Sequence, residues 1–426
     1  MMDTIFAPIT GRGGAVTVLR LSGPAALAIT AALAKNLAPP RHAGLRKLVW
    51  RGRLLDTALV VTFPGPNSFT GEDCAELSLH GGRAVLAAVS EALIAAGARP
   101  AEPGEFSRRA HLNGRLDLLE AEAMADLIAA ETEAQRRLAV EGAGALQQSC
   151  ARWREELRQV MAQQEALIDF PDEDLPQEVE ARLLGRIAAL AKEMYRALAA
   201  APAAERLREG LEFVILGPPN AGKSTLMNEL AGEDVAIVSA IPGTTRDIVG
   251  TRVDFGGVPV HLTDTAGLRD TEDEIEAEGV RRARHRAAKA DLIIAVAAAP
   301  NPEFLDVPQG IEVLRVVTKA DLLVKSVADL AVSAANGAGM AALRTRLTDI
   351  AARLTDTKGA AALSRPRQIA CVRDTAQALD RALANEEPEL RGEELRSAAH
   401  ALARLTGQIG VEEILDAVFS GFCIGK

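Results

Sequence analysis

The sequence predicts a multidomain protein of mixed α/β and α+β class, in which an α+β domain comes first and an α/β domain is inserted into a helical domain. The 426 residues are too many for one hydrophobic core and suggest roughly two to four domains. Strand-like runs come first, helical periodicity follows, and strands then alternate with helices before helix returns. We therefore expect domains at residues 1–118, 119–207, 208–350 and 351–426, with the second and fourth forming one helical domain.

The expected first domain contains the apolar, β-branched run "AVTVLRLSG" and a second run, "LDTALVVTFPGPNSFTGEDCAELSLHGG", broken by Pro-Gly and Thr-Gly. The stretch "AVLAAVSEALIAAGA" predicts a helix in the same domain. This mixture favours a compact α+β domain.

Apolar residues then recur at steps of three and four, as at Leu116, Leu119, Ala123 and Leu127, which predicts helix. The acidic segment "DFPDEDLPQE" interrupts this helical part, which continues to about residue 207. Between 208 and 350 the apolar runs "LEFVILG", "VPVHLTD", "DLIIAV" and "EVLRVVT" alternate with polar loops and helices, as in a mostly parallel sheet covered by helices. Helix is expected again from about 351 to the end.

The composition narrows the class of protein. The formal net charge is −10, so no broad basic surface for nucleic acid is expected. One local run, 281–289 ("RRARHRAAK"), holds five Lys/Arg and is either a patch for RNA or an ordinary solvated helix face. We see no secretory signal and no apolar run long enough to span a membrane. The scattered cysteines predict free thiols in a reducing cytoplasm: Cys74, Cys150, Cys371 and Cys423.

A phosphate-binding loop is the clearest motif. "GPPNAGKST", 217–225, follows the strand "EFVIL" and fits G-x-x-x-x-G-K-[ST]. Its glycines let backbone N–H groups face a triphosphate, Lys223 reaches the β- and γ-phosphate oxygens, and Ser224 ligates Mg²⁺. The helix expected from about Lys223 directs its positive end at the same anion.

Three companion motifs identify the nucleotide as GTP. "HLTDTAG" ends a strand at Asp264, which can hold Mg²⁺ through water, and Gly267 can approach the γ-phosphate. "TKAD" places Asp321 to accept two N–H groups of guanine, which adenine does not offer, and "VSAA" completes the base pocket. The predicted GTP-binding residues are Asn220, Ala221, Gly222, Lys223, Ser224, Thr225, Asp264, Thr265, Ala266, Gly267, Thr318, Lys319, Asp321, Ser333, Ala334 and Ala335.

The order of these motifs predicts a Ras-like P-loop GTPase, but one feature is different. A Ras-like enzyme orients the attacking water with a Gln just after the DxxG motif, and here that position is Leu268. No arginine finger is evident either. Another group must therefore position water and offset the charge of the transition state.

The chain resembles the MnmE/TrmE family of bacterial GTPases, which help to modify the wobble uridine of certain tRNAs. The resemblance covers essentially the whole length and rests on several segments in order. These are "GRGGAVTVLRLSGP", "SFTGEDCAELSLHGG", "PGEFSRRAHLNGRLDLLEAEAMADLI", the GTPase motifs, "PGTTRD" and the terminal "FCIGK".

The resemblance implies a potassium-dependent GTPase that is activated when two G domains dimerise. It implies K⁺ ligands at Asn220, Ser239, Ile241 and Thr244, and Mg²⁺ ligands at Ser224 and Thr245. Such a K⁺ would offset phosphate charge as an arginine finger does. Ala240, Pro242 and Gly243 would also lie against GTP. Glu276 would orient water through a second water, whereas its sequence context alone leaves a surface acid equally open.

In the family, the front domain binds a one-carbon tetrahydrofolate and forms a constitutive homodimer. Motif matching implies folate contacts from Arg20, Glu76, Arg115 and Lys426. Arginine suits the folate carboxylates and glutamate suits the amino-bearing pterin ring. Without the resemblance, these would be ordinary surface charges on a small domain.

The terminal "FCIGK" should be delivered by a helix. Val411, Ile414, Leu415 and Val418 follow i, i+3, i+4 and i+7, so that one face of that helix can pack against the protein. Gly421 permits the helix to stop there. The resemblance implies a catalytic Cys423, although nucleophilic and transfer roles both stay open and a lone terminal thiol is otherwise unremarkable.

Two positions depart from the family pattern. Thr318 stands where the family has the Asn of Asn-Lys-x-Asp, which puts a brace to the phosphate loop, and hence nucleotide affinity, in doubt. Arg115 stands where a folate-contacting Lys is usual, which keeps the charge but changes the donor geometry.

The resemblance implies that the chain adds a carboxymethylaminomethyl or aminomethyl group to C5 of uridine 34 in certain tRNAs. Its partner would be an FAD-containing protein of the MnmG (GidA) type, in a heterotetramer. The carbon would come from 5,10-methylene- or 5-formyl-tetrahydrofolate and the nitrogen from glycine or ammonium. Two alternatives stay open: a regulatory or ribosome-assembly GTPase with an idle tail, and a folate-dependent aminomethyl transferase that merely carries a G domain.

Overall fold

The computed structural model describes residues 3–11, 13–169, 177–233, 250–264, 290–322 and 330–407, together with Val418, Phe419, Phe422 and Gly425. The chain divides into two compact units. The first comprises Met1–Ala125 and Ala403–Lys426, and the second comprises Asp126–Leu402. The first unit is therefore discontinuous in sequence, because residues near the end of the chain belong with the N-terminal part.

The first unit is built on a six-stranded sheet, here called the front sheet, with strand order β3-β4-β5-β2-β1-β6. Neighbouring strands are antiparallel except β1 and β6, which are parallel. Residues of α1 and α2 pack on one face of the sheet, whereas Phe106 of α3 packs with Ile5 and Ala7 on the other. The elements are β1 (Ile5–Pro8), β2 (Val16–Ser22), α1 (Ala26–Leu33), β3 (Gly44–Trp50), β4 (Arg53–Phe63), β5 (Cys74–His80), α2 (Arg83–Ala95), β6 (Arg99–Pro100), α3 (Glu105–Leu112) and α4 (Leu118–Ala129).

Alternation along the strands decides which face is the core. In β2, Leu19 and Leu21 are fully buried in a cluster shared with α1 and α2, and in β5 the same cluster takes Leu77 and Leu79. Burying each such leucine stabilises the fold by about 1.5–3 kcal/mol. Because strand side chains alternate between faces, Arg20, between Leu19 and Leu21, faces away from this cluster.

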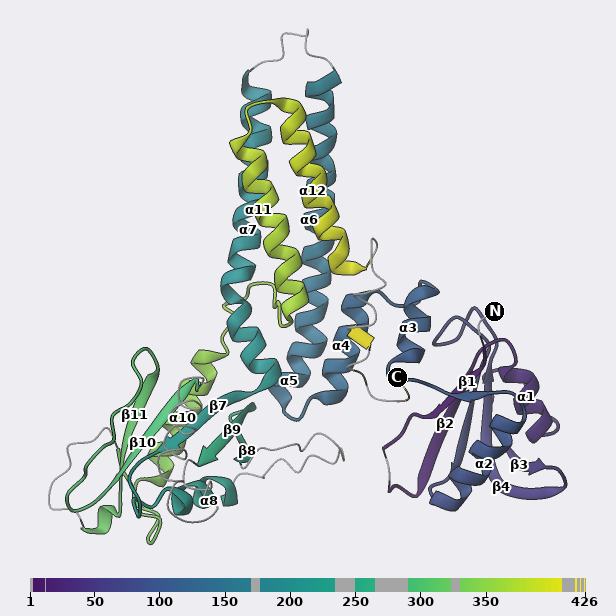
Figure 1. Ribbon diagram of the computed structural model, residues 1–426, viewed down its shortest axis with the longest axis horizontal. Helices are drawn as coiled ribbons and strands as arrows, with labels where there is room; N and C mark the ends of the chain where they lie inside the picture. Colours follow the sequence, from purple (N-terminus) through teal and green to yellow (C-terminus); the bar gives the residue numbers. More distant parts are fainter. Residues whose placement is uncertain are drawn as a thin grey trace, which may run out of the picture. The chain divides into compact units, whose positions relative to one another are not determined.

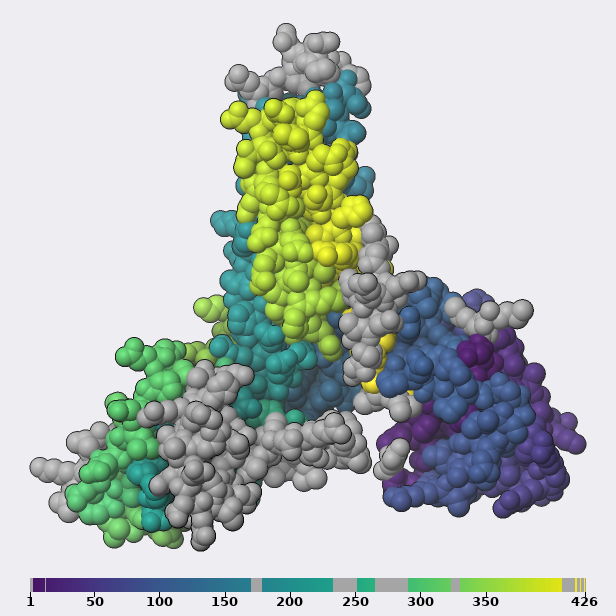
Figure 2. Space-filling model, in the orientation of Figure 1, coloured from purple at the N-terminus to yellow at the C-terminus, as the bar shows by residue number. Residues whose placement is uncertain are grey.

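The second unit contains a bundle of long helices (Figure 1). Helix α6 (Ala143–Asp169) and helix α7 (Gln177–Glu209) run beside α11 (Pro366–Ala384) and α12 (Pro388–Thr406). Figure 2 shows α11 and α12, in yellow-green to yellow, side by side over one face of the bundle. Along the described ranges, no helix is both long enough and apolar enough to cross a membrane.

The helical region begins with a break that the periodicity did not predict. Helix α4 ends at Ala129, and a separate helix α5 (Glu133–Arg137) starts after Thr132. The Thr132 hydroxyl accepts from the backbone N–H of Gln135, and the Gln135 side chain accepts from the Thr132 N–H. This capping box satisfies donors that a helix start leaves unpaired, so it favours a new helix here. Helix α5 continues through a π-helical turn (Leu138–Gly142) into α6.

A second six-stranded sheet, here called the rear sheet, lies within the second unit with strand order β12-β11-β10-β7-β9-β8. All neighbours are parallel except β8 and β9. The mostly parallel sheet predicted from the sequence is thus confirmed. Its elements are β7 (Leu211–Leu216), α8 (Lys223–Glu233), β8 (Gly250–Phe255), β9 (Val258–Asp264), β10 (Leu292–Ala298), β11 (Glu312–Thr318), β12 (Leu330–Ala331) and α10 (Met340–Leu354).

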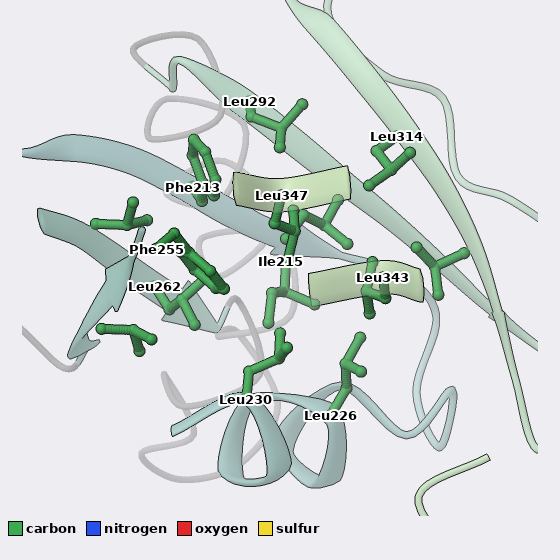
Figure 3. Packing of buried hydrophobic residues seen from close by; sticks show 14 of the residues in the cluster. Phe213, Ile215, Leu226, Leu230, Phe255, Leu262, Leu292, Leu314, Leu343 and Leu347 are labelled. Carbon is green, nitrogen blue, oxygen red and sulfur yellow. The ribbon is translucent and has the colours of Figure 1, made fainter. Parts of the chain in front are cut away.

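The core of the rear sheet explains why the last of these helices starts earlier than predicted. Leu226 and Leu230 of α8 and Leu343 and Leu347 of α10 pack with strand residues such as Ile215 in one buried cluster (Figure 3). Helix α10 therefore begins at Met340, rather than at about 351, because its apolar face completes this core. The next helix, α11, begins only at Pro366.

Candidate nucleotide site and front-sheet site

The phosphate-loop motif lies at the carboxyl end of β7, between β9 and β10, where ligands of parallel sheets bind. Gly217 has no room for a side chain, because an added Cβ would lie 2.2 Å from the carbonyl oxygen of Val296. Asn220 and Gly222 both have positive φ, at 60° and 79°. These conformations turn the loop back on itself ahead of α8, whose first residue is Lys223, as the sequence predicted.

Two predicted Mg²⁺-site residues meet beside this loop. The Ser224 hydroxyl donates to a carboxylate oxygen of Asp264 at 2.6 Å, and Asp264 is only 4 % exposed at the end of β9. Hydroxyl and carboxylate oxygens are the hard donors that Mg²⁺ prefers, so the pair fits that ion. Lys223 is also buried, and its ammonium donates to the carbonyl oxygen of Pro218 at 2.8 Å, across the loop. The ammonium of Lys223, the hydroxyl of Ser224 and the carboxylate of Asp264 thus lie at the carboxyl edge of the rear sheet.

Thr318 is connected to the phosphate loop. Its hydroxyl donates to the carbonyl oxygen of Ala221 at 2.6 Å, and the carbonyl oxygen of Ala297 lies 3.3 Å away. Thr318 is buried at the end of β11, beside Gly222. A hydroxyl therefore makes a loop-to-loop brace at the position where the family resemblance led us to expect an asparagine amide.

The predicted base-recognition residues also lie together. Asp321 accepts a hydrogen bond from the Ser333 hydroxyl at 2.6 Å, and this bond lowers the pKa of the Asp321 carboxyl from its ordinary value. An ionised carboxylate is what two guanine N–H donors require. Lys319 donates to the carbonyl oxygen of Asn220 at 3.1 Å and ties the loop after β11 to the phosphate loop a second time. Ala334 and Ala335 follow Ser333 in the loop after β12.

Several predicted residues of the nucleotide site lie outside the described residues. These are the segment with the implied K⁺ and Mg²⁺ ligands, the remainder of the DxxG motif, and the implied water-positioning acid: Ser239, Ala240, Ile241, Pro242, Gly243, Thr244, Thr245, Thr265, Ala266, Gly267 and Glu276. Leu268 and the basic run 281–289 are outside them too.

On the front sheet, Arg20 and Glu76 form an ion pair across β2 and β5. The guanidinium of Arg20 donates twice to one Glu76 oxygen, at 2.8 and 3.0 Å. Its Cζ also lies 4.7 Å from the centre of the Phe69 ring and 5.9 Å from that of Phe106. Two of the four implied folate contacts are thus adjacent, and both side chains remain partly exposed.

Arg115 approaches the same region from the segment after α3. An added Cβ on Gly71 would lie 3.3 Å from Cγ of Arg115 and 3.0 Å from Cβ of Asn113, so the loop after β4 passes directly beside them. The Asn113 amide donates to the carbonyl oxygen of Thr70 at 2.7 Å. Phe69, which contacts Arg20, and Gly71, which contacts Arg115, therefore belong to one short loop.

The end of the chain packs within this first unit. Phe419 and Phe422 lie with Leu118 and Ala121 in one buried cluster, with the two phenyl centres 5.3 Å apart. Gly425 has φ +101°, and an added Cβ there would lie 2.2 Å from the carbonyl oxygen of Pro8. The tail backbone therefore touches the end of β1, whose neighbour is β2. Cys423 and Lys426 themselves lie outside the described residues, as do Val411, Ile414, Leu415 and Gly421.

One group near the front-sheet site was missed from the sequence. Arg109 in α3 is buried, and it donates to the Asp3 carbonyl at 2.7 Å, to the Asp3 carboxylate at 2.8 Å and to Glu105 at 2.8 Å. It also reaches Glu72 in the loop that carries Phe69. The sequence shows two adjacent arginines, and nothing in it says that this one is buried at a junction of three segments.

Comparison with known proteins identifies the family of the chain. A family model for the "GTP-binding protein TrmE N-terminus" matches residues 4–115, and a model for the "MnmE helical domain" matches residues 118–423. The tRNA modification GTPase MnmE of Acidiphilium cryptum is 60% identical over 427 residues, covering 100% of this chain and 99% of that protein.

Two further relatives also match nearly the whole chain. MnmE proteins of Gluconacetobacter diazotrophicus and Granulibacter bethesdensis are 53% and 51% identical, covering 99% and 100% of this chain and 98% and 99% of those proteins. Identity of this level over nearly the full length of each protein assigns the family without reliance on any single motif. The chain belongs to the MnmE (TrmE) family of tRNA modification GTPases.

Proposed function

We propose that this chain hydrolyses GTP at the rear sheet in order to drive the modification of uridine 34 in certain tRNAs. The observation that carries the proposal is the convergence of Lys223, Ser224, Asp264 and Asp321 at the carboxyl edge of one parallel sheet. Lys223 would neutralise the β- and γ-phosphate oxygens, and Asp321 would accept the N1–H and amino N–H of guanine.

The metal ligands proposed here are those that the family resemblance implies. Ser224 and Thr245 would ligate Mg²⁺, and Asp264 would hold it through water. Asn220, Ser239, Ile241 and Thr244 would ligate K⁺ close to the phosphates, where a monovalent cation offsets developing charge. Asn220 is exposed at the positive-φ position of the phosphate loop, which makes its side chain available for such a role. Glu276 would orient the attacking water.

The front-sheet site would bind a one-carbon tetrahydrofolate, either the 5,10-methylene or the 5-formyl form. Glu76 would pair with the amino-bearing pterin ring, and Arg20, Arg115 and Lys426 would meet polar and carboxylate groups. The position of Phe69 against Arg20 and of Gly71 against Arg115 supports one shared pocket for these residues. The folate would supply the carbon that becomes attached to C5 of uridine.

The position of Gly425 against the end of β1 supports a role for the tail in the same site. Phe419 and Phe422 anchor the tail in the cluster with Leu118, and Cys423 directly follows Phe422 in the sequence. A cysteine thiolate there would act as a nucleophile toward the one-carbon unit or would assist its transfer.

We further propose that the chain works in the cytoplasm as a homodimer, together with an FAD-containing partner of the MnmG type in a heterotetramer. GTP hydrolysis would drive a conformational cycle, whereas the folate and flavin sites would supply the carbon chemistry. The family membership supports this proposal, as does the location of the Arg20–Glu76 pair in the first unit and of the Ser224–Asp264 pair in the second.

Mass analysis of tRNA from a deletion strain tests the proposal. The expected result is the loss of the carboxymethylaminomethyl or aminomethyl group from uridine 34, with restoration by a plasmid copy of the gene. A deletion that leaves uridine 34 fully modified but alters ribosome assembly would overturn it in favour of a regulatory GTPase. Modification that survives Lys223→Ala would point instead to a transferase that only carries a G domain.

A further inference from the structure

One hairpin of the front sheet concentrates positive charge in an otherwise acidic protein. Between Asp3 and Asp56 the sequence holds eight Lys/Arg and no Asp or Glu. Residues 1–118 contain 13 Lys/Arg and 9 Asp/Glu, whereas the whole chain has a net charge of −10. Residues 1–118 therefore carry a net positive charge within an acidic chain, and their densest stretch of positive charge is 35–53.

The cationic residues in that stretch lie on the strand pair β3–β4, in its turn, or in the segment just before β3, and this strand pair lies at one end of the front sheet (Figure 1). We call this group the basic hairpin, and all of its members except the half-buried Arg46 are exposed. The group consists of Lys35, Arg41, Arg46, Lys47, Arg51 and Arg53.

The charges of the basic hairpin are not neutralised internally. In the part of the chain that the structure describes, none of its six members forms an ion pair with a carboxylate. Arg46 donates to the carbonyl oxygen of Asn36 at 2.6 Å, and Arg41 donates to the carbonyl oxygen of Asn67. Carbonyl acceptors fix these guanidinium groups in place and leave their charge uncompensated.

The tip of the hairpin has an unusual residue for its conformation. Arg51 and Gly52 form its two-residue turn with φ of +50° and +79°, a pattern in which Asn-Gly is strongly favoured. An arginine at the first position is disfavoured by its side chain. Arg51 is exposed, with its guanidinium carbon 6.0 Å from the centre of the Trp50 ring, and Arg53 pairs with Trp50 across the turn.

Two simpler explanations account for only part of this charge. An edge strand often carries a lysine that discourages pairing with other sheets, and Lys47 on β3 suits that purpose. That purpose does not require arginines at the turn. A second copy of the chain docked on the same tip would bring like charges together, which is unfavourable.

We propose that the basic hairpin binds the phosphate backbone of the RNA substrate. This inference rests on the proposed function, since it names the surface that holds the tRNA. Exposed, unpaired Lys and Arg neutralise phosphates and release counterions, which gives affinity without base specificity. The basic hairpin therefore positions the RNA on a chain whose overall charge is negative, and the partner protein or other contacts supply the choice of tRNA.

The test compares three variants of the full-length chain in binding to a tRNA transcript, alone and with the flavoprotein partner, over a series of KCl concentrations. In the first variant, K47Q/R51Q/R53Q, tRNA affinity should fall by roughly tenfold or more. The slope of log K against log [KCl] should shrink by about 0.7–0.9 for each phosphate that the variant no longer neutralises. The second variant, K47R/R51K/R53K, retains the charges and should keep most of the affinity and slope.

The third variant, K192Q/R196Q/K358Q, removes as many exposed cations from the second unit and should bind almost as the unaltered chain does. Folate affinity and GTP hydrolysis without tRNA should be unchanged in all three. Equal reductions in the first and third variants would show a general effect of net charge and overturn the proposal.

The outcomes also separate the proposal from its premise. If the unaltered chain binds and modifies tRNA and the first variant does so equally well, the basic hairpin is not the RNA surface, although the proposed function stands. If the unaltered chain, with its partner, binds no tRNA, both fail. If the first variant keeps its tRNA affinity but no longer binds phosphatidylglycerol vesicles, the surface is assigned to a membrane instead. If it keeps its tRNA affinity but no longer self-associates in sedimentation, the surface is assigned to a second copy of the chain.

Discussion

The hydroxyl of Thr318 donates to the carbonyl oxygen of Ala221 at 2.6 Å and so joins the base-recognition loop to the phosphate loop. The family pattern has an asparagine at this position, and the sequence alone left the brace in doubt. The threonine side chain reaches the carbonyl oxygen of Ala221 because β11 ends close to the phosphate loop. An added Cβ on Gly222 would lie 3.5 Å from the same hydroxyl oxygen.

Thr318→Val should weaken GTP binding. Valine keeps the shape of threonine but removes the donor, and a buried carbonyl that loses its partner costs about 1–3 kcal/mol. If about 1 kcal/mol of that cost acts on the nucleotide-bound state, the Kd for GTP rises roughly fivefold. Titration calorimetry with GDP and a GTP analogue measures it. Thr318→Ser keeps the hydroxyl and is the control; equal affinities for all three proteins would show that the brace does not support the site.

GTP hydrolysis should be faster in KCl than in NaCl at equal ionic strength, by roughly tenfold or more if the ion stabilises transition-state charge as a fixed donor does. The site is expected to be sized for K⁺ by several protein oxygens and the phosphates, and Na⁺ is too small for it. Asn220→Ala should reduce the difference between the salts while leaving GTP binding largely intact. Equal rates in the two salts for the unaltered protein would remove the potassium hypothesis.

Glu276→Ala should slow GTP hydrolysis by roughly 10²-fold or more, the usual size of a proton-transfer or water-positioning effect. GTP affinity should change little, because the residue would act in the transition state. Stopped-flow and single-turnover assays separate the two quantities. Glu274→Ala and Glu278→Ala are the controls, and a small, equal effect of all three changes would make Glu276 an ordinary surface acid.

Cys423→Ser should abolish or severely reduce modification of uridine 34 and leave GTP hydrolysis near normal. The thiol belongs to the tail that packs on the first unit, whereas the phosphate loop belongs to the second. Liquid chromatography with mass analysis of cellular tRNA gives the first quantity and a phosphate-release assay the second. Fully modified uridine 34 in cells that carry only the serine variant would exclude the cysteine from the chemistry.

Acid should weaken the first unit through Asp3. Hydrogen bonds from Arg99, with further help from Arg109, lower the pKa of Asp3 from 3.8 to about 2. Since its pKa is lower in the folded state, the stability that it contributes is present above about pH 4. That contribution is lost as the pH falls toward 2.

Asp3→Asn should therefore make the pH dependence of unfolding shallower between pH 4 and 2, as followed by circular dichroism in urea. The effect should be small, because the Asp3 carboxylate is half exposed and solvent screens it. Glu91→Gln on α2 is the matched control, because Glu91 is an exposed carboxylate that forms no ion pair among the described residues. A D3N protein that loses stability with acid as steeply as the unaltered one would show that the cluster around Arg109 does not depend on this carboxylate.

Local sequence determined much of the fold. The apolar, β-branched run "AVTVLRLSG" predicted a strand, which the structure shows as β2, and strand–helix alternation predicted the parallel part of the rear sheet. The phosphate-loop pattern predicted a helix from Lys223, and α8 begins there. These features depend on residues that are neighbours in sequence, so periodicity and motif spacing are sufficient to predict them.

Contacts between distant segments were decided only by the tertiary structure. The start of α10 at Met340 depends on the core that it shares with β7, and the burial of Arg109 depends on Asp3 and Glu72, which approach it only after folding. The sequence showed the positive charges of residues 35–53, but their exposure, and the lack of ion pairs among the described residues, depend on which segments the folded chain brings beside them. Side chains that pair across the fold have no fixed spacing along the chain, and no local pattern records them.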